Sequence, residues 1–563
     1  MSCSNSYSSS ASFCPKAYCA QSRANKNVYL CKVIFNLTLF LKQAKIVRFM
    51  KVRFFHLFSL FFFSVGIVFA QSESKFTFST GPELEERKGD ALLNTFGHHQ
   101  DFFFTLRNNR RRNGEFILEK IDTDSLSVLL TQNFSLPELK GMVPILAYPI
   151  SSKTSSFLIA TAEDPEDEDL FILAYQIGDD LSISKQPIVL GIGNRKAILA
   201  ENGFLLFKTD NEEKIALLVP AEANEARNEK FQIRYFNSDF KLERSEKLEI
   251  PYSSGQVSLR SAVLSPSGTL HGVIAVSRSS DMAVTPDGYA LLTYNPTDGI
   301  VKEKALSLGS KWFYDLKLTL TPDTNLWLAG YYSNMVEPSM AGTFSVLIES
   351  RTGDLLDTGL YPFDREFRLI FRSDLKSGED DLGQFKLDQA YIGKDSHLKL
   401  ISEKRYNRSS TIFNPATGTY SIIQIYSYDE LLISDIRSNS TIEKNIVIPK
   451  YQSSSREEGR FTSYLLLEDE ETTWIFYNDH VRNANLALND YNSYRQLNNE
   501  NNIVITHLQI DGSNIQKGII DPKLTDDYLL DPVHHYETDN ALILTTYKGY
   551  RTRYLKVNLP DSQ

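Results

Sequence analysis

One unit recurs along almost the whole chain: an apolar strand, a polar turn and a second strand. It is visible in FQIRYFNSDFKLERSEKLEI, in YALLTYNPTDGIVKEKALSL and in FSVLIESRTGDLLDTGLYPF. Successive turns lie 56, 60, 58, 56, 85 and 74 residues apart when they are marked by Asp122, Gly178, Ser238, Pro296, Thr352, Arg437 and Asp511. Periods of this size are typical of stacked or radial repeats. The sequence therefore predicts an architecture, but it identifies neither a reaction nor a ligand.

Each unit divides into about four strands. The unit at 311–366 reads FYDLKLTLT, LWLAGYYS, GTFSVLIES and LLDTGLYPF, with turns such as PDTN and RTGD between them. Gly, Pro, Asn and Asp fall at these turns, where their backbone preferences permit tight reversal, and no long segment has a helical period. The pattern predicts an all-β fold, a single closed β-propeller of four-stranded blades. Propeller sheets are covered on both faces, which explains continuously apolar strands such as FLIAT and ALILTTY.

The two ends of the repeat region predict how the ring closes. The last segment, from residue 529, supplies only three strands, while KFTFSTGPEL near residue 75 is a strand without a unit of its own. We predict that this N-terminal strand (75–79) becomes the outer strand of the last blade and latches a ring of eight blades. Seven blades are the alternative, because the two long steps contain insertions at 377–389, at 420–436, which resembles an extra hairpin, and at 483–502.

The first 70 residues differ from the rest. Met50 begins MKVRFFHLFSLFFFSVGIVFAQS, which has a basic start, an apolar run and a Val-Phe-Ala site, the parts of a secretory signal peptide cleaved after Ala70. We interpret residues 1–49 as a mis-assigned extension without a fold, 50–70 as the signal peptide and 71–563 as the propeller domain. An uncleaved membrane anchor and a genuine cysteine-bearing extension are the alternatives.

Charge and cysteine content exclude several classes of function. All four cysteines precede Met50, so the mature chain has neither disulfides nor thiol chemistry. Nine basic and no acidic residues lie in positions 1–70, which leaves 51 basic against 70 acidic side chains and a net charge of −19. Nucleic acid is therefore not an expected partner, because phosphate contacts need basic patches. The basic run from Arg107 to Arg112 is interpreted as a solvated loop, with an anionic partner as the alternative.

Two stretches carry a family resemblance. They are LAGYYSNMVEPSMAGTFSVLIESRTGDLLDTGLYPFDREF (328–367) and NIVIPKYQ (445–452) followed by GRFTSYLLLEDEETTWIFYNDHVRN (459–483). They resemble a family of exported bacterial β-propeller-like proteins of unknown function, over about a quarter of the chain. The resemblance implies export and fold but assigns no catalytic residue. The insertion at 483–502 departs from it.

Two histidine pairs are the first candidate site. His98 and His99 precede a strand of the first unit, and His534 and His535 precede a strand of the last, so ring closure predicts that the pairs approach one another. Four imidazoles, with Asp101 or Glu537, offer ligands to zinc. Adjacent strand residues point to opposite faces, however, and the spacing matches no ligand motif. We favour packing positions over a metal site, and we expect no cofactor.

Other polar groups offer weaker candidates. The acidic loop Asp164, Glu166, Asp167, Glu168 and Asp169 has oxygen ligands for calcium but lacks EF-hand spacing, so a solvated loop is favoured. Asn478, Asp479 and His480 follow an apolar strand. The catalytic hypothesis is that Asp479 and His480 act as a general base, and the favoured alternative is a turn held by backbone hydrogen bonds. Asn478 with Tyr491 and Tyr494 could contact a ligand.

No hydrolase elbow, zinc-protease motif or phosphate-binding loop is present. We therefore expect a monomeric binding or scaffold protein, exported to the periplasm or exterior of a Gram-negative bacterium, with a glycan or peptide ligand and no membrane span after cleavage. An exported polysaccharide hydrolase or lyase with its site at the channel mouth is the alternative. Two or three carboxylates converging there with a His or Tyr would favour the enzyme.

Overall fold

The computed structural model describes residues 76–559, except for short segments. Those segments are 86–89, 110–113, 165–166, 168, 196–202, 223–227, 254–255, 278–285, 337–338, 372–381, 394, 415–417, 438–440, 456–458, 469–471, 498–501 and 512–513. The expectations for the signal peptide and the extension lie outside the described residues, as do Arg110–Arg112, Glu166 and Glu168. No helix among the described residues is long and apolar enough to cross a membrane.

The described chain forms eight antiparallel sheets of four strands, each built from consecutive segments except for the last. The first four sheets are β3(Asp90–Phe96)–β4(Phe102–Asn109)–β5(Phe116–Asp122)–β6(Val128–Phe134), β7(Pro144–Ser151)–β8(Ser156–Glu163)–β9(Asp169–Ile177)–β10(Ile188–Asn194), β11(Leu205–Lys208)–β12(Lys214–Glu222)–β13(Asn228–Asn237)–β14(Leu242–Ser253) and β15(Val257–Leu264)–β16(Leu270–Val276)–β17(Gly288–Asn295)–β18(Ile300–Leu306).

The other four sheets carry the longer connections of the chain. They are β19(Trp312–Leu320)–β20(Leu326–Ser333)–β21(Gly342–Ile348)–β22(Leu355–Pro362), β23(Phe385–Ile392)–β24(Leu398–Asn414)–β25(Thr419–Ile436)–β26(Ile442–Ile448), β28(Leu465–Glu468)–β29(Thr473–His480)–β30(Ile503–Asp511)–β31(Asn514–Ile519) and β32(Leu529–Glu537)–β33(Ala541–Lys548)–β34(Arg551–Asn558) with β1(Thr77–Thr80). Short elements join them: β2(Leu84–Glu85), β27(Gln452–Ser454), α4(Arg365–Ile370), α5(Pro522–Thr525) and the 3-10 turn η2(Val481–Asn483).

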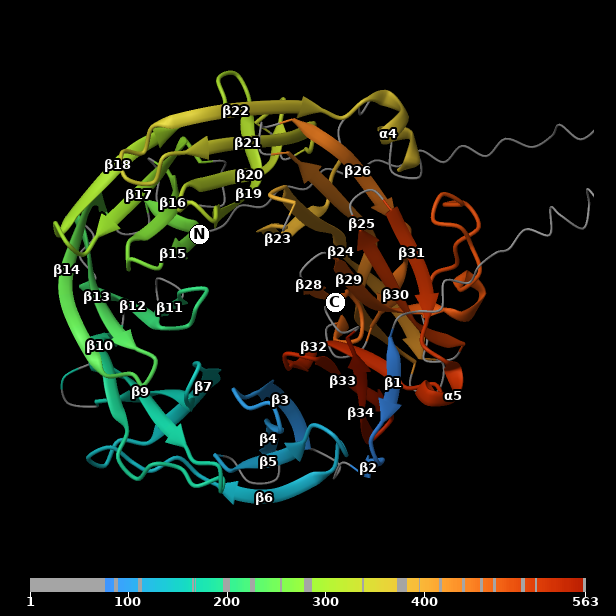
Figure 1. Cartoon of the computed structure of the whole chain (residues 1–563), viewed down its shortest axis with the longest axis horizontal. Helices are drawn as coiled ribbons and strands as arrows, with labels where there is room; N and C mark the ends of the chain where they lie inside the picture. The colour runs from blue at the N-terminus through green and yellow to red at the C-terminus, as the bar shows by residue number, and fades with distance from the viewer. Residues whose placement is uncertain are drawn as a thin grey trace, which may run out of the picture. The chain divides into compact units, whose positions relative to one another are not determined.

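The sheets are arranged radially, with the first strand of each innermost (Figure 1), which is the arrangement of a β-propeller. The all-β class and the four-strand unit predicted from the sequence are confirmed, and every turn marker falls at the end of the third strand of its sheet or in the turn that follows it. The stretch 420–436 was expected as an extra hairpin. It belongs instead to one strand of 18 residues, β25.

Burial follows the position of a strand within its sheet. The second strands β8, β20, β29 and β33 are buried almost throughout because neighbouring sheets cover both of their faces. The fourth strands β18 and β22 are largely exposed. Apolar clusters between consecutive sheets form the core, such as Phe104 and Leu106 with Leu158 and Tyr175.

The first and last sheets also lie side by side. Strand β3 contacts β32, and Phe103 packs with Tyr536 and Tyr554 in one buried cluster. At the other edge of the last sheet β1 pairs with β34, in the register Thr77↔Asn558 to Thr80↔Leu555. This is the pairing that the sequence predicts for the N-terminal strand.

Candidate functional site

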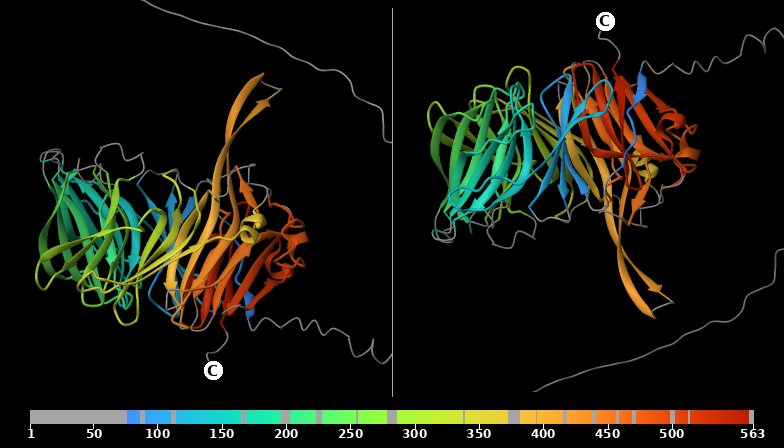
Figure 2. Two further views of the ribbon diagram at one scale, coloured as in Figure 1. Left: turned by 90° about the horizontal axis from the view of Figure 1, so that it is seen from above. Right: turned by 90° about the horizontal axis from the view of Figure 1, so that it is seen from below.

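The most distinctive surface feature is a long hairpin formed by β24 and β25. Its outer part projects away from the sheets (orange in Figure 2). Up to Lys404 strand β24 pairs with β23 as well as β25, and β25 pairs with β27 and β26 from Tyr426 onward. Residues 408–413 and 420–425 pair only with each other among the described strands. Both edges of this two-stranded ribbon therefore present backbone groups without a strand partner.

The outer hairpin exposes large apolar side chains. Phe413 lies opposite Tyr420 and Thr411 lies opposite Ile422, so Phe413, Tyr420 and Ile422 share one face. The two rings are 5.0 Å apart between centroids, and the exposed fractions are 50% for Phe413, 73% for Tyr420 and 72% for Ile422. Ile412, on the other face, is 48% exposed.

The charge of the hairpin differs from that of the rest of the chain. Residues 405–425 contain two arginines and no acidic residue, in a chain with a formal net charge of −10. One of these, Arg405, is engaged at the base of the hairpin, whereas Arg408 is exposed. The projecting part is therefore apolar and weakly cationic.

A buried ionic network holds the base of the hairpin. Glu403 and Lys450 have no exposed side-chain surface, and Lys450 Nζ lies 2.7 Å from Glu403 Oε1. Arg405 Nε is 2.7 Å from Glu403 Oε2, and Arg405 Nη2 is 2.7 Å from Asp388 Oδ2. Desolvation raises the pKa of Asp388 to about 6, against the lowering effect of Arg405, and burial lowers the pKa of Lys450.

The network includes residues of the second stretch that carries the family resemblance (445–452 and 459–483). Lys450 Nζ donates to Gln452 Oε1 (2.7 Å), which also accepts the Ser463 backbone N–H (2.7 Å), and Tyr464 donates to Asp388 Oδ2 (3.2 Å). Buried charges are retained where opposite charges and hydrogen bonds compensate them. Residues far apart in sequence thus fix the hairpin on the sixth sheet. Sequence reasoning missed this network, although a lysine inside the apolar phrase IVIPKYQ was a signal of it.

Asn478 lies in a buried position between the seventh and eighth sheets. Its amide nitrogen donates to the carbonyl oxygens of Phe461 (2.9 Å) and Leu530 (2.8 Å), and its amide oxygen accepts from the Leu530 N–H (2.8 Å). All three bonds go to backbone, so the side chain links β29 to β32.

Asp479 and His480 do not form a side-chain pair. Asp479 Oδ1 accepts from Asn483 Nδ2 (2.7 Å) and from the His480 backbone N–H (2.8 Å), and desolvation raises the pKa of the buried carboxyl. The His480 ring caps η2 by accepting the Arg482 N–H (3.1 Å). These are the bonds of a turn, and among the described residues no hydrogen bond joins the two side chains.

Tyr491 and Tyr494 are both at least partly buried. Tyr494 is buried, its hydroxyl donates to the Leu486 carbonyl, and Lys517 lies over its ring at 4.7 Å from the centroid. Tyr491 is partly buried beside the apolar cluster between the fifth and sixth sheets. Both rings are less exposed than those of Phe413 and Tyr420 in the outer hairpin.

The two histidine pairs contact different neighbours. His98 Nδ1 is 3.0 Å from Ser156 Oγ on β8, and His99 Nε2 is 3.2 Å from Asp179 Oδ1 in the turn after β9. His534 hydrogen-bonds Asp531 (2.8 Å) and the Leu93 carbonyl of β3 (3.0 Å). Among the described residues no hydrogen bond or ion pair joins one pair to the other, and their proximity stays a prediction.

A carboxylate ends the first strand of each of the last two sheets. Glu468 ends β28 and Glu537 ends β32, and His535 Nε2 lies 3.6 Å from Glu537 Oε1. Desolvation and the charge of Glu537 raise the pKa of Glu468 to about 7, although Lys399 opposes them. The pKa of His535 is lowered to about 4, chiefly by desolvation.

Comparisons with known proteins give no family. No protein-family model matches the chain, and no curated protein matches it. Solved structures with a similar arrangement include the WD40 domain of SCAP from fission yeast (10% identity, 87% of this chain, 96% of that chain, TM-score 0.37). A europium-containing methanol dehydrogenase (8%, 86% and 93%, TM-score 0.40) and the polysaccharide lyase Uly1 (10%, 84% and 90%, TM-score 0.33) are further examples.

Proposed function

We propose that the chain is an exported β-propeller, closed as a ring of eight blades, that binds a protein ligand through the β24–β25 hairpin. Closure is supported by the pairing of β1 with β34 and by the contact of β3 with β32. Export is supported by the signal-peptide pattern that begins at Met50 and ends at Ala70. The cell compartment is then the periplasm or exterior of a Gram-negative bacterium.

The observation that carries the proposal is the exposed apolar surface on a ribbon with unpaired edges. A two-stranded hairpin that extends into water is marginally stable by itself, and its apolar side chains gain free energy when a partner covers them. A protein ligand can add a strand to an open edge and cover Phe413, Tyr420 and Ile422 together. A glycan would use chiefly the two aromatic rings, so the aliphatic side chains favour a protein.

The proposal is tested with paired variants of exposed residues. A screen of the purified protein against peptides and glycans identifies ligands. Phe413→Ser combined with Tyr420→Ser is then expected to weaken peptide binding at least tenfold, because aromatic anchors dominate interface energies. Leu129→Ser with Leu130→Ser is the matched control, since these side chains of β6 are similarly exposed, at 50% and 46%. Binding that resists the hairpin change, or a glycan as the only ligand, would contradict the proposal.

An exported polysaccharide hydrolase or lyase is the second candidate, and the Glu468, Glu537 and His535 group favours it. A carboxyl group whose pKa is near 7 suits a general acid, and its neighbour can serve as the partner carboxylate. Glu468→Gln is expected to abolish any activity on a polysaccharide panel while folding is retained. Absence of product from every polysaccharide with the wild-type protein would reject this candidate.

A further inference from the structure

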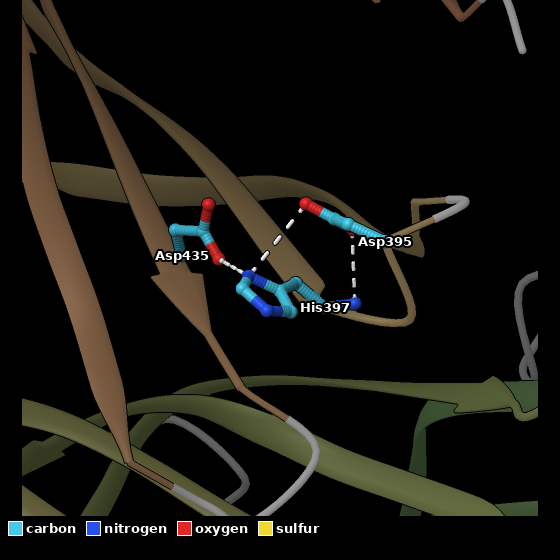
Figure 3. Close-up of side chains that lie close together, drawn as sticks. All are labelled: Asp395, His397 and Asp435. Atoms are coloured by element: carbon cyan, nitrogen blue, oxygen red, sulfur yellow. Dashed lines mark hydrogen bonds and ion pairs between the residues drawn. The ribbon is translucent and has the colours of Figure 1, made fainter. Parts of the chain in front are cut away.

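A second cluster of functional side chains lies away from the projecting part of the hairpin. Asp395 and His397 occupy the turn between β23 and β24, and Asp435 lies near the end of β25 (Figure 3). Among the described residues, these are the only three His, Cys, Asp or Glu side chains whose ligand atoms all lie within 4.8 Å of one another. Sequence reasoning did not select them, because 38 residues separate His397 from Asp435.

The local structure explains why they converge. Asp395 Oδ1 accepts the His397 backbone N–H (3.0 Å), which holds the turn. The next residue pairs along the two strands, Leu398↔Ile436 and Lys399↔Asp435, show that Lys399 and Asp435 share one face of the sheet. His397 precedes Lys399 by two residues and points to the same face, toward Asp435.

Both carboxylates face the same imidazole nitrogen. His397 Nδ1 is 2.8 Å from Asp435 Oδ1 and 3.6 Å from Asp395 Oδ2, and Asp435 is buried. A ring nitrogen carries at most one proton, so it can satisfy one carboxylate and leaves the other beyond hydrogen-bond distance. Three possible metal ligands therefore converge where one proton can bridge only two of them. A bound cation could contact all three.

The charges around the cluster are mixed. Lys399 Nζ lies 3.3 Å from Asp395 Oδ2, and Lys444 lies opposite Asp435 on β26. Lys399 also interacts with Glu468, whose pKa its charge lowers against the larger raising effect of desolvation. Lys399 is thus the cation that a bound metal ion must displace from Asp395.

We propose that Asp395, His397 and Asp435 form a binding site for a divalent transition-metal ion, with Zn²⁺ as the ion of best fit. One imidazole nitrogen and two carboxylate oxygens are ligands that Zn²⁺ accepts, and three protein ligands leave a fourth tetrahedral position for water or a substrate atom. Bonds of about 2.0–2.1 Å separate tetrahedral ligand atoms by about 3.3 Å. The observed spacings of 2.8 and 3.6 Å lie on either side of this value. The site does not depend on the proposed function of the hairpin.

Calorimetric titration of the metal-free protein with Zn²⁺ tests the site. One equivalent is expected to bind, and Asp395→Asn, His397→Ala and Asp435→Asn should each weaken the affinity about a hundredfold or more. Because Asp395 and His397 lie in a turn that is at least partly exposed, their variants keep the test valid if the buried Asp435→Asn fails to fold. Lys399→Met should strengthen binding about tenfold, because it removes a competing charge.

His99→Asn is the matched control, because His99 and Asp179 form a histidine–carboxylate pair without a third ligand. It should leave Zn²⁺ binding unchanged. The proposal is overturned if the wild-type protein binds no Zn²⁺ at submillimolar concentration. It is equally overturned if the three ligand variants bind as the wild type does, or if His99→Asn removes the binding and they do not.

Discussion

At the scale of single residues, two lysine–glutamate pairs of similar geometry occupy opposite environments. Lys450 and Glu403 are completely buried, with Nζ 2.7 Å from Oε1. Lys208 and Glu212 are 2.6 Å apart, but their side chains are 34% and 40% exposed. The N–O distance therefore does not determine how much each pair contributes to the free energy of unfolding. Desolvation of the charges determines it.

Lys450→Met should lower the free energy of unfolding by up to about 3–5 kcal/mol, because it removes one of the two cations that compensate the buried Glu403 carboxylate and leaves only Arg405. Lys208→Met should change the free energy by less than about 1 kcal/mol, because water screens the exposed pair. Urea denaturation of both variants measures the difference. Equal effects would contradict the interpretation that the network holds the hairpin base.

His507 predicts how stability depends on pH. Its ring is buried among Phe76, Phe78 and Trp474, and desolvation lowers its pKa from 6.5 to about 4. Between these values the unfolded chain binds a proton that the folded protein does not, so stability falls as the pH drops from about 6.5 to about 4. The loss attributable to His507 is up to about 3 kcal/mol.

Denaturation curves at several pH values, for the wild type and for His507→Phe, test this dependence. The variant should lose less stability on acidification, because phenylalanine does not titrate. Parallel pH dependences of the two proteins would show that other groups, such as His271 with its similarly lowered pKa, are responsible.

At the scale of elements, we expect the base and the outer part of the hairpin to differ in local stability. Its base belongs to the sixth sheet and contains the buried network, whereas its outer part pairs with no other described strand. Protection from hydrogen exchange follows burial and ladder bonding. Residues 407–423 should exchange within seconds, while 398–404 and 431–436 stay protected for hours. Mass spectrometry of peptides from the exchanged protein measures both, and uniform protection of the outer hairpin would indicate that it is covered in solution.

Elements were more predictable from the sequence than the sites they carry. Turn residues such as Gly178 and Pro296 located the third turn of each unit, because backbone preference is a local property. The length of β25 was missed, since TYSIIQIYSYDELLISDI alternates in the same way whether it is one strand or two. The convergence of Asp395, His397 and Asp435 depends on strand register, which local patterns do not determine. The proximity of the two histidine pairs stays a prediction, although His534 bonds the Leu93 carbonyl of the first sheet.

At the scale of the whole molecule, the N-terminal strand joins two sheets. Phe76 is buried, and its ring centroid lies 3.9 Å from that of Trp474 on the seventh sheet, while β1 pairs with β34 on the eighth. Phe76→Ala should therefore destabilise the protein by about 3–5 kcal/mol. Phe413→Ala, at the exposed hairpin tip, should change stability by no more than about 0.5 kcal/mol. Thermal and urea unfolding compare the two, and a small effect of Phe76→Ala would contradict a latch.

The pairing of β1 with β34 also sets an order of events during synthesis. Of the described strands, β1 is made first, and its partner is made last, with more than 450 residues between them. Sheets built from consecutive segments can form as they emerge, but β1 has no strand partner until β34 has been made. The last step of folding is therefore a slow, non-local one, and before it the edge of β34 is open to other chains. In nascent chains that end before β34, strand β1 has no strand to pair with. We expect chaperones and proteases to recognise this unpaired strand.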